Sequence, residues 1–305
     1  MPADRSAGRN VFIEFASAPG IIQGGLCAAK RLTQAQFLDM LDILFIAPGG
    51  FYAYIRGSSK PIWSTEQVLR RGYYILYTKI DGEKIHVSNQ HFYPRVLSLE
   101  NTGETDSFRD QVRRRDRRCV ITHHEAVEAD DDHWVGFEVA HILPKSRADI
   151  FHQEYMERLI DPKPGGVNSP QNGILLRADI HQLWDNYEIS MKPDSGYRVQ
   201  VFRPSGWYIH NKIMHICSRQ ANHQQRVLDL FLRWHFEQAV LCNMRGTGEP
   251  LWEHDFPPGS DMVGEILEGP VPAQRMEVEL FKRLHGYDGA VSEEDSDKDE
   301  DGDRA

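Results

Sequence analysis

Cysteine and long apolar runs are scarce in this chain of 305 residues. The four cysteines, Cys27, Cys119, Cys217 and Cys242, lie far apart and form no CxxC pair. This spacing argues against a disulfide framework or a four-cysteine zinc site, and it favours a reducing compartment. No run approaches the ~18 apolar residues of a membrane-spanning helix, and the polar first ten residues do not resemble a secretory signal. We therefore expect an intracellular protein, cytoplasmic or nuclear, without a membrane partner.

The chain also lacks an excess of basic residues, since its net charge is -10. Residues 292–305 hold eight acidic and two basic residues, so this segment contributes -6 and the remaining 291 residues contribute -4. No large apolar residue follows Val291, and we expect a disordered acidic tail over 291–305. The mildly acidic body does not exclude a nucleic-acid partner, because binding depends on local charge.

A small α+β domain is expected over residues 1–104. Apolar patterns predict strands at 11–15, 51–56 and 73–80 and a capped helix at 33–45. Asp81-Gly82 is typical of a hairpin turn leading into residues 84–87. The aromatic residues of this unit are expected in the sheet core rather than on a surface that stacks bases (Tyr73, Tyr74, Tyr77, Phe92 and Tyr93).

A second unit is expected over residues 105–205. Its predicted elements are helices at 106–117, 149–160 and 174–186 and strands at 119–122, 136–142, 188–191 and 197–202. Residues 206–290 are expected to form a long amphipathic helix at 219–241 and a Gly/Pro-rich extended arm at 246–275.

A cluster of arginines lies where the second unit begins. Its members are Arg113, Arg114, Arg115, Arg117 and Arg118. Because this run leads directly into the following motif, it is a candidate for phosphate contact, and a nuclear-import patch has the same composition. The alternative is a solvated helix face whose arginines pair with nearby aspartates.

Three short pieces contain the residue types needed for metal-assisted hydrolysis: residues 138–144 (EVAHILP), 172–176 (NGILL) and 179–185 (DIHQLWD). His181 and Asp185 are four apart on a predicted helix, so their side chains share a face and are able to hold one divalent cation. His141, near a strand end, and Asn172 are then candidates to orient and activate a water beside that ion.

These pieces resemble the HNH nuclease family, in the branch that reads AHI-P, then NGxLLR, then DxHxLxD. The similarity extends over residues 119–202, and the N-terminal unit with its TDSFRDQVRRRDRRCVIT junction resembles fungal proteins of this kind. The resemblance implies an α+β protein with a ββα-metal (His-Me finger) domain, in which a hairpin packs on a helix with one metal ion between them.

The resemblance also implies roles for individual residues. His141 falls on the general base, Asn172 on the asparagine that orients the base and its loop, and His181 and Asp185 on metal ligands. The implied activity is endonucleolytic hydrolysis of phosphodiesters, with DNA favoured as the partner. The implied cofactor is one divalent ion, Mg²⁺ in the first place, with Mn²⁺, Ni²⁺ or Zn²⁺ as alternatives.

One position departs from many family members, because Ala140 stands where an Asp or His ligand often precedes the base. Glu138 lies on the same strand face as Ala140 and is a candidate to replace the missing metal ligand, directly or through water.

Taken alone, His141 also fits a hydrogen-bonded core histidine, and His181 with Asp185 fits a helix-surface ion pair. The alternative function is therefore a catalytically inactive HNH-fold scaffold that binds nucleic acid or protein. Chemistry on a small molecule is a third interpretation, without positive support in the sequence.

Overall fold

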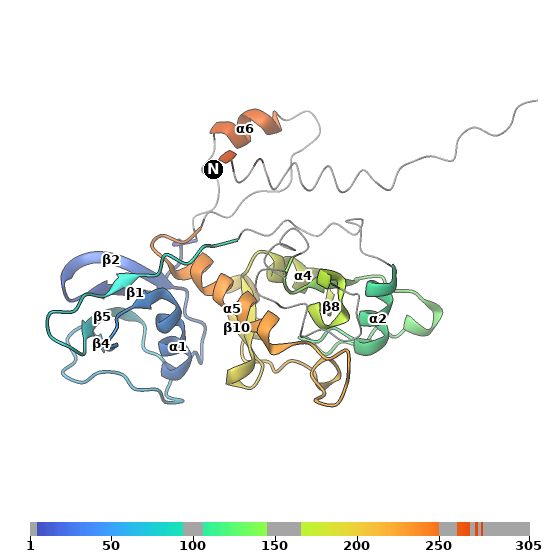
Figure 1. Ribbon diagram of the computed structural model, residues 1–305, viewed down its shortest axis with the longest axis horizontal. Helices are drawn as coiled ribbons and strands as arrows, with labels where there is room; N and C mark the ends of the chain where they lie inside the picture. Colours follow the sequence, from blue (N-terminus) through green and yellow to red (C-terminus); the bar gives the residue numbers. More distant parts are fainter. Residues whose placement is uncertain are drawn as a thin grey trace, which may run out of the picture.

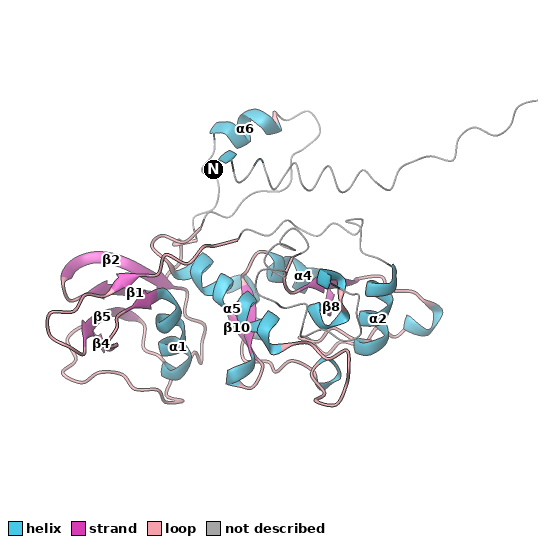
Figure 2. Ribbon diagram, viewed as in Figure 1, coloured by secondary structure: helices cyan, strands magenta, loops and turns pink. Residues whose placement is uncertain are grey.

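The computed structural model describes residues 5–93, 106–144, 166–249, 261–268, 272–273 and 276. Over these residues the protein is a mixed α+β molecule with several small sheets (Figures 1 and 2). An N-terminal unit holds the largest sheet, and a second unit holds the motif residues. The helix α5 (Asp229–Met244) runs between the two units (Figure 1).

The N-terminal sheet has four strands in the order β2-β1-β5-β4. They are β1 (Val11–Phe15), β2 (Ala18–Leu26), β4 (Phe51–Ile55) and β5 (Gly72–Thr78). β1 pairs with β5 in parallel and with β2 in antiparallel fashion, and β4 pairs antiparallel with β5. The predicted strands 11–15, 51–56 and 73–80 are thereby confirmed, whereas β2 was not predicted.

Helix α1 (Gln34–Leu44) covers one face of this sheet, and its start follows from the sequence. The Thr33 hydroxyl accepts a hydrogen bond from the Gln36 backbone N–H, and the Gln36 side chain accepts one from the Thr33 N–H. This capping box satisfies two amides that the helix leaves unpaired. Four apolar side chains of the helix are buried in the core between it and the sheet (Phe37, Met40, Leu41 and Leu44).

Two expectations for this unit are wrong. Residues 84–87 do not return along β5 as a hairpin, because β6 (His86–Val87) pairs with β3 (Phe45–Ile46), which follows α1. Among the tyrosines, Tyr74 is buried in the core, but Tyr73 and Tyr77 lie on the other face of the sheet and are 39% and 45% exposed.

The second unit is built around an antiparallel hairpin, β7 (Phe137–His141) with β8 (Gly173–Arg177), followed directly by α4 (Ala178–Asp185). Helix α2 (Asp106–Asp116) also packs on β8. A second antiparallel pair, β9 (Ile189–Lys192) with β10 (Arg198–Val201), confirms the last two predicted strands.

Other predicted elements in this region differ from the structure. Residues 119–122 form a buried turn rather than a strand, and residues 173–177 form a strand rather than the first half of a helix. The long helix begins at Asp229 instead of residue 219. Part of the predicted extended arm is the short helix α6 (Met262–Glu268). The predicted helix at 149–160 and the acidic tail at 291–305 lie outside the described residues.

Short 3₁₀ segments connect these elements. They cover Ala129–Asp131, Gly166–Asn168, Pro170–Asn172, Pro193–Ser195, Pro204–Ile209 and Ile216–Ser218.

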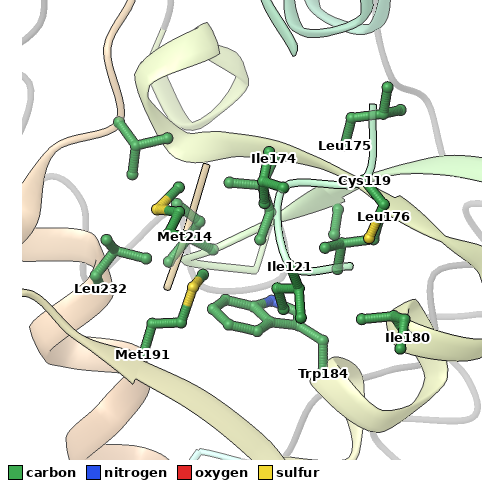
Figure 3. Packing of buried hydrophobic residues seen from close by; sticks show 14 of the residues in the cluster. Cys119, Ile121, Ile174, Leu175, Leu176, Ile180, Trp184, Met191, Met214 and Leu232 are labelled. Atoms are coloured by element: carbon green, nitrogen blue, oxygen red, sulfur yellow. The ribbon is translucent and has the colours of Figure 1, made fainter. Parts of the chain in front are cut away.

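Trp184 of α4 is part of the apolar core beneath the hairpin, and its indole lies among Ile121, Ile174 and Met191 (Figure 3). The core of the second unit therefore fixes the position of α4, which holds two of the candidate site residues.

Candidate active site

Helix α4 holds His181 and Asp185 on one side and its apolar anchor on the other. Ile180 and Trp184 are fully buried in the core under the hairpin (Figure 3), and the Trp184 ring stacks on the His235 ring with centroids 3.6 Å apart. Because His181 and Asp185 are one helical turn apart, they project together from the helix toward β7.

Glu138, His181 and Asp185 form one chain of contacts at the junction of β7 and α4. His181 Nδ1 lies 2.6 Å from Glu138 Oε2, and His181 Nε2 lies 3.2 Å from Asp185 Oδ2. The His181 and Asp185 side chains are 4% and 2% exposed, whereas the Glu138 side chain is 26% exposed. Each ring nitrogen of the imidazole therefore faces one carboxylate.

The two carboxylates control the charge of His181. Burial by itself lowers the pKa of this imidazole, but Asp185 and Glu138 outweigh that effect and raise the pKa to about 10. Without a metal ion, His181 is therefore an imidazolium between two acids at neutral pH.

The site has one feature expected of a metal ligand. His181 Nε2 is buried, and its 3.2 Å contact with Asp185 Oδ2 is an ion pair that does not have the geometry of a hydrogen bond. When two ligand atoms each lie about 2.1 Å from one ion and the angle between them at the ion is about 90°, the two atoms are roughly 3 Å apart. The observed distance between His181 Nε2 and Asp185 Oδ2 is 3.2 Å. No group of three His, Cys, Asp or Glu in the described ranges is arranged around a common ion position. The pair His181 and Asp185 thus fits a cation, while Glu138 holds the opposite ring nitrogen.

His141 ends β7 and is 5% exposed. Its Nε2 lies 3.0 Å from Asn168 Oδ1, and its ring stacks on Phe108 of α2 with centroids 4.3 Å apart. Because side chains alternate along a strand, His141 leaves β7 on the face opposite to Glu138. The structure connects His141 to α4 through its backbone, since Trp184 Nε1 donates to the His141 carbonyl at 3.3 Å.

Asn172 is fully buried and holds the chain on both sides of the hairpin opening. Its Oδ1 accepts from the Leu143 N–H at 2.8 Å, and its Nδ2 donates to the Leu143 carbonyl at 2.9 Å and the Val167 carbonyl at 2.8 Å. The Asn172 carbonyl also accepts from the Ile142 N–H at 2.8 Å. Asn172 therefore fixes the two residues that follow His141.

The arginine run does not form a continuous phosphate-binding surface. Arg115 contradicts that expectation most clearly: its side chain is 1% exposed and donates to Asp116 and to three backbone carbonyls, those of Pro170, Gly173 and Gln225. It is an internal clamp that joins α2 to β8, because a buried guanidinium needs this many acceptors.

The other arginines are also engaged, in three different ways. Arg117 pairs with Asp130 at 2.5 Å and Arg118 with Glu125 at 2.7 Å, and the Arg113 guanidinium lies over the Trp134 ring at 5.0 Å. Arg114 is exposed and bonds the Asp110 carbonyl at 3.3 Å. Arg114 and Arg117 are the exposed residues of the run, and Arg117 is paired with Asp130.

Sequence reasoning missed several contributors to this site. Phe108 and Asn168 contact His141, Asp116 anchors Arg115 and the Leu175 amide, and His235 supports Trp184. Phe108 and Asp116 lie in the junction before the motif pieces, and Asn168 and His235 lie outside them, but only the tertiary structure shows which site residue each one contacts.

Two family models match parts of this sequence. Residues 119–192 match the family model HNH_2, described as HNH endonuclease. The HNH endonuclease match assigns this part of the chain to a nuclease-type hydrolase class at the family level. Residues 8–82 match a domain of unknown function, DUF8573. No curated protein and no solved structure matches the chain. Within the described ranges, no helix is long and apolar enough to cross a bilayer.

Proposed function

We propose that the protein is a metal-dependent endonuclease that hydrolyses phosphodiester bonds, with DNA as the favoured substrate and little sequence specificity. The observation that supports this most directly is the buried pair His181 and Asp185, whose facing atoms lie 3.2 Å apart without the geometry of a hydrogen bond, inside the region that matches HNH endonucleases. One divalent ion at this pair would neutralise charge on the scissile phosphate and stabilise the departing oxygen.

The residues of this chain have separate tasks in the proposal. Glu138 accepts a hydrogen bond from His181 Nδ1–H, which would leave the Nε2 lone pair for the ion, as carboxylates behind metal-bound histidines do. This replaces the expectation that Glu138 itself ligates the metal. Asp185 supplies the second ligand, and its negative charge favours binding of the cation.

His141 is the proposed general base. His141 Nε2 lies 3.0 Å from the Asn168 amide oxygen, and this contact holds the orientation of the imidazole. Asn172 supports this by fixing the backbone after His141, and the stack on Phe108 restricts rotation of the ring. Imidazole and carboxylate together suit Mn²⁺, Ni²⁺ and Zn²⁺ as well as Mg²⁺.

Plasmid nicking by the full chain, with each of the four ions in turn, tests this function. His141→Ala should lower the nicking rate about 10²–10⁴-fold and leave DNA binding in a mobility-shift assay nearly unchanged. His181→Ala should instead weaken metal binding itself. His133→Ala is the matched control, because His133 is an exposed histidine of the same unit, paired with Glu128, and should nick as the wild type does.

Absence of nicking with all four ions, in a folded sample that binds metal, would reject the proposal. Nucleic-acid or protein binding that EDTA does not affect would then support the inactive HNH-fold scaffold. Location in the cytoplasm or nucleus stays a prediction from the cysteine usage.

A further inference from the structure

The N-terminal sheet has one face that α1 does not cover. Side chains alternate along each strand, so the burial of Ala53, Tyr74 and Leu76 on the α1 side places their strand neighbours on the other side. We call this second side the outer sheet face. Its aromatic members are Phe12, Tyr52, Tyr54, Tyr73 and Tyr77, with Trp63 at the edge beside Tyr52.

These rings are partly packed on one another and remain accessible. Phe12 stacks on Tyr73 at 4.9 Å, and Tyr77 meets Tyr54 edge-on at 5.3 Å. Trp63 is 60% exposed, Tyr77 45% and Tyr73 39%. The core of this unit lies on the α1 side, so packing within the unit does not require this many aromatic residues here. Contiguous exposed apolar patches of this kind mark interaction surfaces.

Two basic side chains lie over aromatic rings of the outer sheet face. The Arg56 guanidinium lies over the Tyr73 ring at 4.2 Å, and Lys79 Nζ lies over the Tyr52 ring at 5.1 Å. Glu14 pairs with Arg56 from within the sheet. Residues 56–79 contain five Lys and Arg against a single acid, Glu66, in a chain whose net charge is -10. Arg56 and Lys79 therefore place two basic groups directly on the rings of the outer sheet face.

We infer that the outer sheet face binds single-stranded nucleic acid by stacking unpaired bases on its aromatic rings, with phosphates held by Arg56 and Lys79. Every base has a flat π surface, and exposed aromatic side chains and guanidinium planes stack it without regard to sequence. A duplex keeps its bases inside the helix, so a flat aromatic sheet discriminates in favour of unpaired strands.

Together with the proposed nuclease, this surface points to a substrate class: nucleic acid that contains an unpaired segment. That consequence rests on the proposed function, whereas the binding itself does not. Binding is therefore measured in EDTA, where no cleavage occurs, so that failure of either proposal is recognised separately.

The test is fluorescence anisotropy of the full chain with labelled oligo-dT and oligo-U of about 20 nucleotides, longer than the roughly 4–16 that one such module covers. A duplex of the same length is the comparison. We expect the single strands to bind at least about tenfold more tightly than the duplex. The two single-stranded probes distinguish a DNA from an RNA preference.

Single substitutions test whether the nucleic acid binds at the outer sheet face. Trp63→Ala and Tyr77→Ala should each weaken oligo-dT binding roughly 5- to 100-fold, the range for loss of one base stack. Lys79→Gln should lower the slope of log affinity against log salt by about 0.7, the value for one phosphate contact on a single strand. Tyr208→Ala removes an equally exposed ring, 61% exposed, from the second unit, and should bind as the wild type does.

Preference for the duplex, or wild-type binding by both ring variants with their thermal unfolding unchanged, would overturn the inference and leave this face to a protein partner. If single strands bind as expected while the plasmid is never nicked, the binding inference stands and the nuclease proposal fails.

Discussion

His181 shows how a buried residue couples charge to stability. Its pKa of about 10 in the fold, raised by Asp185 and Glu138 against the opposing effect of burial, exceeds the value of roughly 6.5 in an unfolded chain. The protonated ring therefore binds its proton more tightly when the protein is folded. This contribution to stability is fully present below pH ~6.5 and is lost as the pH rises through about 10.

Thermal unfolding in EDTA between pH 6 and 10 tests this coupling. The wild type should lose stability across that range, and His181→Gln, which cannot be protonated, should lose much less. His210→Gln is a matched control, because burial lowers the pKa of His210 to about 4. That histidine destabilises the fold on the acidic side, below pH ~6.5, so its variant should follow the wild type at alkaline pH. Parallel curves for His181→Gln and wild type would refute the assigned charge state.

Among the arginines, identical residue types have different environments. Arg115 is enclosed by four acceptor groups, while Arg114, its neighbour, is exposed. Loss of a buried charge partner is costly because the remaining charge stays unpaired. Substitutions in this run are therefore informative about phosphate binding at Arg114, but at Arg115 they report on folding.

At the scale of elements, the close approach of α2 to β8 depends on Gly173. A Cβ at this position would lie 2.7 Å from Val112 Cγ2 and 2.8 Å from the Phe108 ring. Gly173 is the register partner of His141, and Phe108 is the ring on which His141 stacks. The small residue thus allows α2 to support the candidate base.

Gly173→Ala should destabilise the protein by about 1–3 kcal/mol, since the added methyl group overpacks this contact. Urea denaturation measures the change. A double-mutant cycle with Phe108→Leu provides the control: the two substitutions should be non-additive, because the smaller side chain makes room for the methyl group. Strict additivity would mean that the two positions do not share this contact.

At the scale of the whole molecule, α5 joins the two units. Phe231 and Leu232 in its first turns belong to the core under the hairpin, and Val240 and Leu241 in its last turns belong to the core of the N-terminal sheet. The side chains of Arg5 and Arg9 also bond the end of this helix, at Asn243 and Gly246. One helix therefore supplies both cores, and the units should unfold together.

Scanning calorimetry should accordingly show one transition that both ends of α5 control. Phe231→Ala and Leu241→Ala should each lower the same melting temperature, with costs of about 3–5 and 2–5 kcal/mol. Arg233→Ala, at an exposed position of the helix paired with Asp194, should cost no more than about 1 kcal/mol. Two separate transitions, each shifted by only one of the core substitutions, would show that the units are independent.

Local patterns in the sequence were sufficient for several elements and for part of the site. The capping box at Thr33 predicted α1, and alternating apolar residues predicted β1, β4, β9 and β10. The spacing of His181 and Asp185 placed both on one helix face, and the motif residues indicated the HNH family. Each of these signals involves residues within one or two turns or strand pairs, where backbone geometry alone sets which side chains meet.

Only the tertiary structure decided the rest, because the deciding partners are far away in the sequence. The apolar segment 174–177 fits a helix or a strand by its period, and it becomes β8 because β7, more than thirty positions earlier in register, supplies its hydrogen bonds. Residues 119–122 become a buried turn for a similar reason, with the Val120 N–H donating to Leu175. The position of Glu138 on the second nitrogen of His181, the enclosure of Arg115 and the exposure of Tyr77 likewise follow from packing between elements, which a linear pattern does not encode.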